Sequence, residues 1–176
     1  PNILLLMDNS GSMDSSAYHN ANEAYNPAKA YYGYFDPTLC YSYGSSRYQI
    51  GTSRAATAPT CGATYPWDGN FLNYMTMSRM EVAKWVMMGG KCSPRAVNGT
   101  CYPGGKLNYE TTDRFTALTS NATGVTSYTG TRCFDRGGNN LIVYDGAACG
   151  GSSTSHSLAV DIASEPLGVI QQVGDK

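Results

Sequence analysis

The pattern of apolar and polar positions changes abruptly at residue 8. Residues 3–7 form the unbroken apolar run Ile-Leu-Leu-Leu-Met, and Asp8 ends it. A continuous apolar run without alternation is typical of a strand that is buried on both faces. The sequence therefore predicts a buried strand over residues 3–8, followed directly by a loop of Asn, Ser and Gly.

The clearest helical pattern covers residues 69–89. Asp68 or Asn70 can cap its start, and Gly89 can end it. We expect its apolar face to pack against residues 3–7. That face is formed by residues at three- and four-residue spacing, namely Phe71, Met75, Val82, Trp85, Val86 and Gly89.

Two long segments show no sustained periodicity. Residues 14–66 are rich in Tyr, Gly, Ser and Asn, and residues 91–155 contain four of the six cysteines. We interpret both as loop-rich insertions, and we predict a second helix over residues 157–173 despite Pro166 within it. Short strands are candidates at 106–109, 125–129 and 141–144.

The composition argues against two classes of partner. The net charge is −1 and only 14% of the residues are charged, so there is no basic surface for nucleic acid. No apolar run reaches the roughly 18 residues that a membrane span needs. Because the chain opens directly on an apolar strand, we expect any export signal to have been removed or to lie upstream.

The six cysteines predict an oxidising compartment and three disulfides. They form no C-x-x-C pair and only two His accompany them, which makes zinc and thioredoxin-like sites weak interpretations. Six cysteines allow fifteen pairings. We predict closure between nearest neighbours, because each such pair brackets a loop rich in small polar residues. The predicted pairs are Cys40–Cys61, Cys92–Cys101 and Cys133–Cys149.

The loop after the first strand contains candidate metal ligands. In an extended segment the side chains of Asp8, Ser10 and Ser12 point the same way and can converge on one small cation. Carboxylate and hydroxyl oxygens suit a hard divalent cation such as Mg²⁺ or Ca²⁺. The same residue types also form ordinary turns, and that alternative stays open. An EF-hand would need Gly and Glu where the chain has Met13 and His19, and a P-loop motif is absent.

Three stretches carry a resemblance to known families. Residues 1–13, PNILLLMDNSGSM, resemble the first strand and the metal-ion-dependent adhesion site (MIDAS) of von Willebrand factor A-type domains. Residues 67–84, WDGNFLNYMTMSRMEVAK, with the Gly-Gly-Lys of residues 89–91, resemble a helix of the PilY/PilC-like type IV pilus tip adhesins of bacteria. Residues 31–43, with Tyr-Tyr-Gly-Tyr-Phe-Asp and Cys-Tyr-Ser-Tyr, resemble an insertion that those proteins place before that helix.

The resemblance implies an α/β fold, namely an incomplete von Willebrand A-type (Rossmann-like) domain with two long disulfide-bearing, loop-rich insertions. It also implies a much longer exported protein, in which a carboxy-terminal β-propeller usually follows. Later metal-site loops that supply a Thr and an Asp would lie beyond residue 176. We therefore expect residues 1–176 to be the first part of the domain, with the sheet completed by the remainder of the protein or by a second chain.

The function implied is a non-catalytic adhesion and assembly module at a pilus tip. Asp8, Ser10 and Ser12 would hold a divalent cation that binds a host or surface ligand, and pilus subunits would be further partners. The expected location is extracellular, at the cell surface or pilus tip. The alternative is a processed structural fragment that assembles with copies or partner chains, its metal motif vestigial. His19 and His156 are isolated and no Ser is marked as activated, so we do not expect an enzyme.

Overall fold

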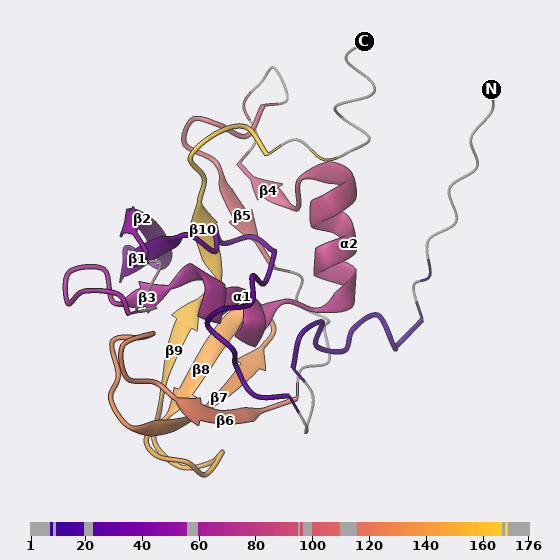
Figure 1. Ribbon diagram of the computed structural model, residues 1–176. Helices are drawn as coiled ribbons and strands as arrows, with labels where there is room; N and C mark the ends of the chain where they lie inside the picture. The colour runs from indigo at the N-terminus through magenta and orange to yellow at the C-terminus, as the bar shows by residue number, and fades with distance from the viewer. Residues whose placement is uncertain are drawn as a thin grey trace.

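The computed structural model describes residues 8, 10–19, 23–55, 60–94, 96, 100–109, 116–166 and 168 (Figure 1). Except for Asp8, the predicted strand 3–8 lies outside these residues. The elements in chain order are β1 (Leu39–Gly44), β2 (Arg47–Ser53), β3 (Trp67–Asp68), α1 (Gly69–Thr76), α2 (Arg79–Met88), β4 (Cys92–Ser93), β5 (Lys106–Asn108), β6 (Leu118–Asn121), β7 (Thr131–Gly137), β8 (Asn140–Tyr144), β9 (Ser153–Ser157) and β10 (Ala159–Asp161).

The strands form two sheets. One has the order β3-β1-β2-β10-β5-β4, and the other has the order β6-β7-β8-β9. Every strand pairing in the described part of the chain is antiparallel except that of β10 with β2, which is parallel and places Val160 opposite Tyr48. The fold is thus a mixed α/β arrangement made mostly of sheet. A parallel, Rossmann-like sheet around the first strand stays a prediction.

The predicted helix over residues 157–173 is wrong where the structure describes it. β9 pairs with β8 along its whole length, and β10 then pairs with β5 in the other sheet, so one extended segment joins the two sheets. Leu158 and Val160 are fully buried in this segment. β8 pairs with β9 on one side, and β2 and β5 flank β10 on both sides, and this tertiary pairing outweighs the weak helical spacing of its apolar residues. Residues 167 and 169–173 lie outside the described residues.

The predicted helix over residues 69–89 is divided into two helices. Asp68 caps α1, and its carboxylate accepts a hydrogen bond from the backbone N–H of Asn70 at 2.8 Å. Ser78 caps α2 by accepting from the N–H of Glu81 at 3.1 Å, which is one half of a capping box. The backbone of Met77 is extended at the break, and α2 ends at Gly89 in the left-handed conformation. The break rotates α2 away from the face predicted for one continuous helix.

The predicted apolar face is therefore correct only in part. Phe71 and Met75 in α1 are fully buried, whereas Val82 and Trp85 in α2 are partly buried. Val86 is 45% exposed, so its predicted burial is wrong. The region of the first strand against which this face was expected to pack lies outside the described residues.

The short strands and the disulfides were predicted more accurately. β5 and β8 confirm the candidates at 106–109 and 141–144. The candidate at 125–129 is wrong, because the N–H groups of Val125 and Thr126 both bond back to the carbonyl of Ala122 in a turn that follows β6. All three predicted disulfides are present and no cysteine is free.

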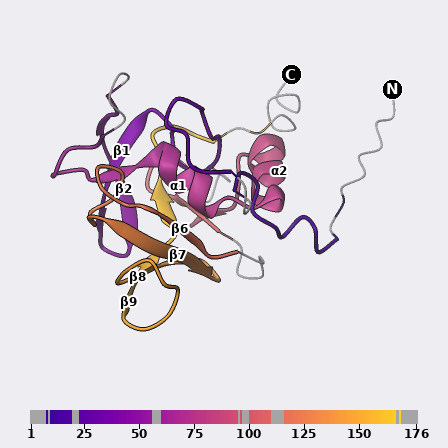
Figure 2. The same ribbon diagram turned by 60° about the horizontal axis from the view of Figure 1, so that its bottom comes forward.

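The core surrounds α1, and all eight of its residues are buried. In both views α1 lies between the β1–β2 hairpin on one side and α2 on the other (Figures 1 and 2). Aromatic rings fill much of the space and meet edge to face, as for Phe71 and Phe134 at 5.4 Å and Tyr48 and Trp67 at 5.4 Å between centroids. A helix that is buried on all sides explains why its two Asn residues must find partners inside the protein.

A buried ion pair connects β7 to α2. Nη2 of Arg136 lies 3.7 Å from Oε1 of Glu81, and the side chains of both residues are fully buried. Arg136 also donates from Nη1 to the carbonyl of Thr76 at 3.1 Å, and its guanidinium lies 4.7 Å from the ring centroid of Tyr109. Tyr34 donates its hydroxyl proton to the other oxygen of Glu81. These contacts stabilise the position of α2 against the four-stranded sheet.

Candidate metal loop and its support

The three predicted metal ligands lie close together on one exposed loop. Oδ1 of Asp8 accepts a hydrogen bond from the backbone N–H of Ser10 at 2.8 Å, and Oγ of Ser10 lies 2.9 Å from Oγ of Ser12. All three residues are exposed. The hydrogen bonds from the backbone and side chain of Ser10 lower the pKa of Asp8 below its ordinary value, so this carboxylate is charged at neutral pH.

The three side chains offer the type of ligand atom that a hard divalent cation prefers, but too few ligands to fill its coordination shell. Asp8, Ser10 and Ser12 offer only oxygen atoms, which Mg²⁺ and Ca²⁺ prefer, yet these ions take six or more ligands. In the described part of the chain no group of three or more His, Cys, Asp or Glu side chains gathers as a metal site. The remaining ligands would have to be water or residues from elsewhere. The bond from Ser10 to Asp8 also forms an Asx turn, so the plain-turn interpretation agrees with this geometry as well.

The loop is attached to the start of α2. The N–H groups of Arg79 and Met80, at the start of the helix, have no acceptor within the helix. They donate instead to the carbonyls of Ser15 and Met13 at 3.0 and 2.9 Å. The guanidinium of Arg79 reaches the carbonyl of Ser12 at 3.4 Å. In Figure 1 the indigo segment accordingly passes the lower end of α2. Because these bonds satisfy N–H groups that a helix end leaves unpaired, they stabilise the helix and the loop together.

Sequence reasoning missed the role of Asn70 and Asn73 on α1. Asn73 donates from Nδ2 to the carbonyls of Tyr31 and Phe35, both at 2.7 Å, and accepts from the N–H of Phe35 at 3.1 Å. Asn70 accepts from the N–H of Tyr31 at 2.8 Å. The signal in the sequence was two Asn residues three positions apart within an otherwise apolar helix, because buried amides require partners.

The loop over residues 31–35 approaches α1 very closely. A Cβ atom on Gly33 would lie 2.5 Å from Oδ1 of Asn73 and 2.6 Å from Cγ of Met77, so only Gly fits there. The Tyr-rich motif and the Asn-containing helix motif, which are about 40 residues apart in sequence, therefore form one interlocked unit. The two stretches that resembled pilus tip adhesins depend on each other for their structure.

Comparison with known proteins identifies the family. The family described as "PilY1 homolog, small alpha/beta domain" matches residues 22–161, which is most of the chain. This chain belongs to that family. The matched range of the PilY1 homolog small α/β domain contains every named helix and strand, from β1 to β10.

One relative extends the comparison to a whole protein. The chain is similar to the "Type IV pilus biogenesis factor PilY1 homolog" of Xylella fastidiosa (strain Temecula1 / ATCC 700964), with 31% identity over 98 residues. The match covers 49% of this chain and 6% of that protein, so the chain corresponds to a small part of its relative. No solved structure matches.

The family match bears on the predicted pilus relation but not on the predicted metal ligands. The relation to PilY1-like proteins of the type IV pilus is confirmed, whereas Asp8, Ser10 and Ser12 lie before the matched range. The von Willebrand A-type assignment and the metal role of these residues stay predictions. In the described part of the PilY1 homolog domain, no helix is long and apolar enough to cross a membrane.

Proposed function

We propose that this chain is a non-catalytic adhesion and assembly module of a type IV pilus protein, and that its exposed loop helps to bind a divalent cation. Membership of the PilY1 homolog family and the similarity to a type IV pilus biogenesis factor support the pilus-related role. Three disulfides in a chain without free cysteines support an extracellular or cell-surface location.

The observation that carries the metal proposal is the grouping of the three oxygen ligands. The hydroxyls of Ser10 and Ser12 lie 2.9 Å apart, and the carboxylate of Asp8 is held beside them by a bond of 2.8 Å. This loop is also bonded to the start of α2, which limits how far it can move. Ligands that are held near their bound positions lose less conformational entropy when a cation binds.

The proposed module works by presenting an incompletely coordinated cation. Asp8 would supply the negative charge, and Ser10 and Ser12 would supply two neutral oxygen ligands. A carboxylate from a host or surface ligand would complete the coordination. The remaining protein ligands and the rest of the sheet would come from the remainder of the same protein or from a second chain, and pilus subunits would be further partners.

Titration calorimetry with MgCl₂ and CaCl₂ tests this proposal on the 176-residue chain and on the full-length protein. We expect weak or no binding by the chain alone, because three ligands leave half or more of the coordination shell to water. We expect measurable binding by the full-length protein. Asp8→Ala should abolish that binding because it removes the only charged ligand of the three, whereas Ser10→Ala and Ser12→Ala should weaken it less.

Matched controls are available within the same loop. Asp14→Ala and Ser15→Ala change the same residue types without touching the three ligands, and both should leave cation affinity unchanged. Tight binding by the 176-residue chain alone would show that the site is complete here and that the expected later loops are not needed. An absence of binding by the full-length protein would make the loop a structural turn and would favour the assembly role.

A further inference from the structure

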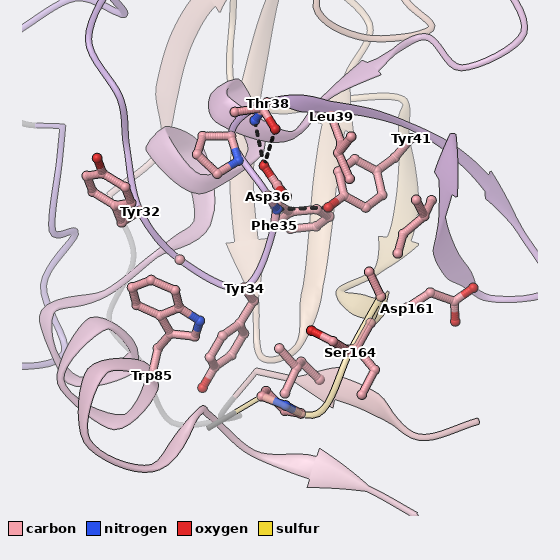
Figure 3. Close-up of a pocket in the computed structure, with 17 residues that line it drawn as sticks. Tyr32, Tyr34, Phe35, Asp36, Thr38, Leu39, Tyr41, Trp85, Asp161 and Ser164 are labelled. Atoms are coloured by element: carbon pink, nitrogen blue, oxygen red, sulfur yellow. Dashed lines mark hydrogen bonds between the residues drawn. The ribbon is translucent and has the colours of Figure 1, made fainter. Parts of the chain in front are cut away.

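A groove with a volume of about 420 Å³ lies between residues 32–39 and residues 161–164, with Trp85 of α2 also in its lining. Figure 3 shows Tyr32 and Trp85 at one end, Asp161 and Ser164 toward the other, and Asp36 along the edge between them. Its volume is within the range of ligand-binding pockets, and its lining is mainly aromatic and aliphatic with a few polar groups. Most of its lining residues lie within the matched family range of residues 22–161, and all of them are well apart in sequence from the proposed cation ligands.

The aromatic end of the groove is formed before any ligand arrives. The rings of Tyr32 and Trp85 are nearly parallel, with 16° between their planes and 6.5 Å between their centroids. Tyr32 is 56% exposed, yet its backbone carbonyl accepts a hydrogen bond from the hydroxyl of Tyr18 at 2.6 Å. Asn73 fixes both ends of the 31–35 loop that carries it. The backbone that carries the Tyr32 ring is therefore held in place at both ends of the loop.

The charge of the groove is negative. Among the described residues that line it, the ionisable groups apart from Tyr hydroxyls are the carboxylates of Asp36 and Asp161, and none is a Lys, Arg or His. Asp161 is paired with Nε of Arg47 at 3.2 Å. Asp36 is exposed, and no basic side chain in the described part of the chain pairs with it. Oδ1 of Asp36 accepts from the N–H and hydroxyl of Thr38, which holds the carboxylate in place.

We propose that this groove binds a partner peptide segment that presents an arginine beside apolar residues. The guanidinium of that arginine would pair with Asp36, and a neighbouring side chain of the segment would lie against Tyr32 and Trp85. Arginine fits better than lysine, because its planar group can bond to a carboxylate through two N–H groups. Apolar neighbours of the arginine would contact the aliphatic wall formed by residues such as Leu39 and Ile50. The aliphatic lining and the unpaired carboxylate favour this occupant over a neutral sugar.

Two-dimensional ¹H–¹⁵N NMR of the 176-residue chain can test the proposal, because the chain has only two Trp residues. Trp67 is buried and serves as an internal reference, whereas the indole N–H of Trp85 reports on the groove. The probe is a pool of acetylated, amidated tetrapeptides with arginine at the second position and Leu, Pro or Tyr elsewhere. The matched pool has neutral citrulline in place of arginine.

We expect the arginine pool to shift the Trp85 signal and the citrulline pool to bind about tenfold more weakly, as the loss of one charge-assisted contact predicts. Asp36→Asn keeps an oxygen that can accept from Thr38, so the turn is preserved, and it should weaken the arginine pool by a similar factor. Asp145→Asn removes an exposed carboxylate outside the groove, and it should leave the affinity for the arginine pool unchanged.

Three results would overturn the proposal. Equal binding of the arginine and citrulline pools would show an apolar site without charge recognition. Full binding by Asp36→Asn, with an unchanged spectrum elsewhere, would exclude Asp36 as the charge partner. A Trp85 shift with maltohexaose or cellohexaose but not with the arginine pool would make the groove a sugar site.

Discussion

Asn73→Ala should be among the most damaging single substitutions in this domain. The side chain is fully buried and makes three hydrogen bonds to the backbone of the 31–35 loop. Its removal leaves the carbonyl of Tyr31 and both the carbonyl and the N–H of Phe35 without their partner. Tyr31 and Phe35 are themselves 0% and 1% exposed, so water cannot replace the amide without rearrangement.

The size of the effect follows from the number of groups left unpaired. An unsatisfied buried polar group costs about 1–3 kcal/mol. Three such groups, with some relaxation of the loop, predict a loss of about 3–6 kcal/mol in the free energy of unfolding. That is a large share of the roughly 5–15 kcal/mol by which native domains are stable. The loop carries Tyr32, so the variant should also disturb the aromatic end of the groove.

Urea unfolding of the oxidised protein at pH 7, followed by near-ultraviolet circular dichroism, measures this change. The control is Asn26→Ala, because Asn26 is exposed and its side-chain oxygen accepts one local hydrogen bond, from the N–H of Ala28 at 3.0 Å. We expect the control to lose less than about 1 kcal/mol. The double variant of Asn70 and Asn73 should lose less than the sum of the single variants, since both amides hold one loop.

The reasoning would be refuted by a small effect with an unchanged transition slope. If Asn73→Ala lost less than about 1 kcal/mol, the backbone groups of the loop would have found other partners at little cost. The loop would then be held by ring packing rather than by the amide. An unchanged indole N–H signal of Trp85 in Asn73→Ala would likewise show that ring packing, and not the amide, holds the loop.

Three further predictions concern stability. Burial lowers the pKa of His19 to about 4 from its ordinary 6.5, so the unfolded chain binds the proton more readily than the folded chain. The contribution of neutral His19 to the free energy of unfolding is therefore fully present above about pH 6.5 and falls by up to about 3 kcal/mol toward pH 4. His19→Gln should reduce this dependence of stability on pH, measured by urea unfolding at a series of pH values. Arg136→Met removes the guanidinium that lies 3.7 Å from the buried Glu81 carboxylate and should cost about 3–5 kcal/mol, part of which the added Glu81→Gln change should restore in thermal unfolding. Replacing Cys133 and Cys149 by Ser should cost about 3 kcal/mol in urea unfolding, with little change in the far-ultraviolet spectrum of the folded state.

The local features of this chain were readable from its sequence. Nearest-neighbour disulfides follow from six cysteines that bracket short, loop-rich segments, and all three are present. The capping residue Asp68 and the terminating Gly89 have the predicted roles, because caps depend on side-chain chemistry within a few residues. The grouping of Ser10 with Ser12 is also local, but it arises in a turn, in which the N–H of Met13 donates to the carbonyl of Ser10 at 2.9 Å, and not in the extended segment that was predicted.

Features that depend on distant partners were not readable. Residues 153–161 became an extended segment because strands of two different sheets pair with it, although the apolar spacing favoured a helix. The break between α1 and α2 is stabilised by bonds from α2 to residues 13–15, which lie more than 60 positions earlier in the chain. The same is true of the buried pair of Arg136 and Glu81.

The sequence by itself determined the disulfide framework and the helix caps, because each depends on residues close together in the chain. Only the tertiary structure decided which side chains hold the Tyr-rich loop, where α2 turns away from α1, and that an acidic, aromatic groove forms beside it. Those features require contacts between residues tens of positions apart, and the free energy of such contacts depends on the complete packed arrangement rather than on any local pattern.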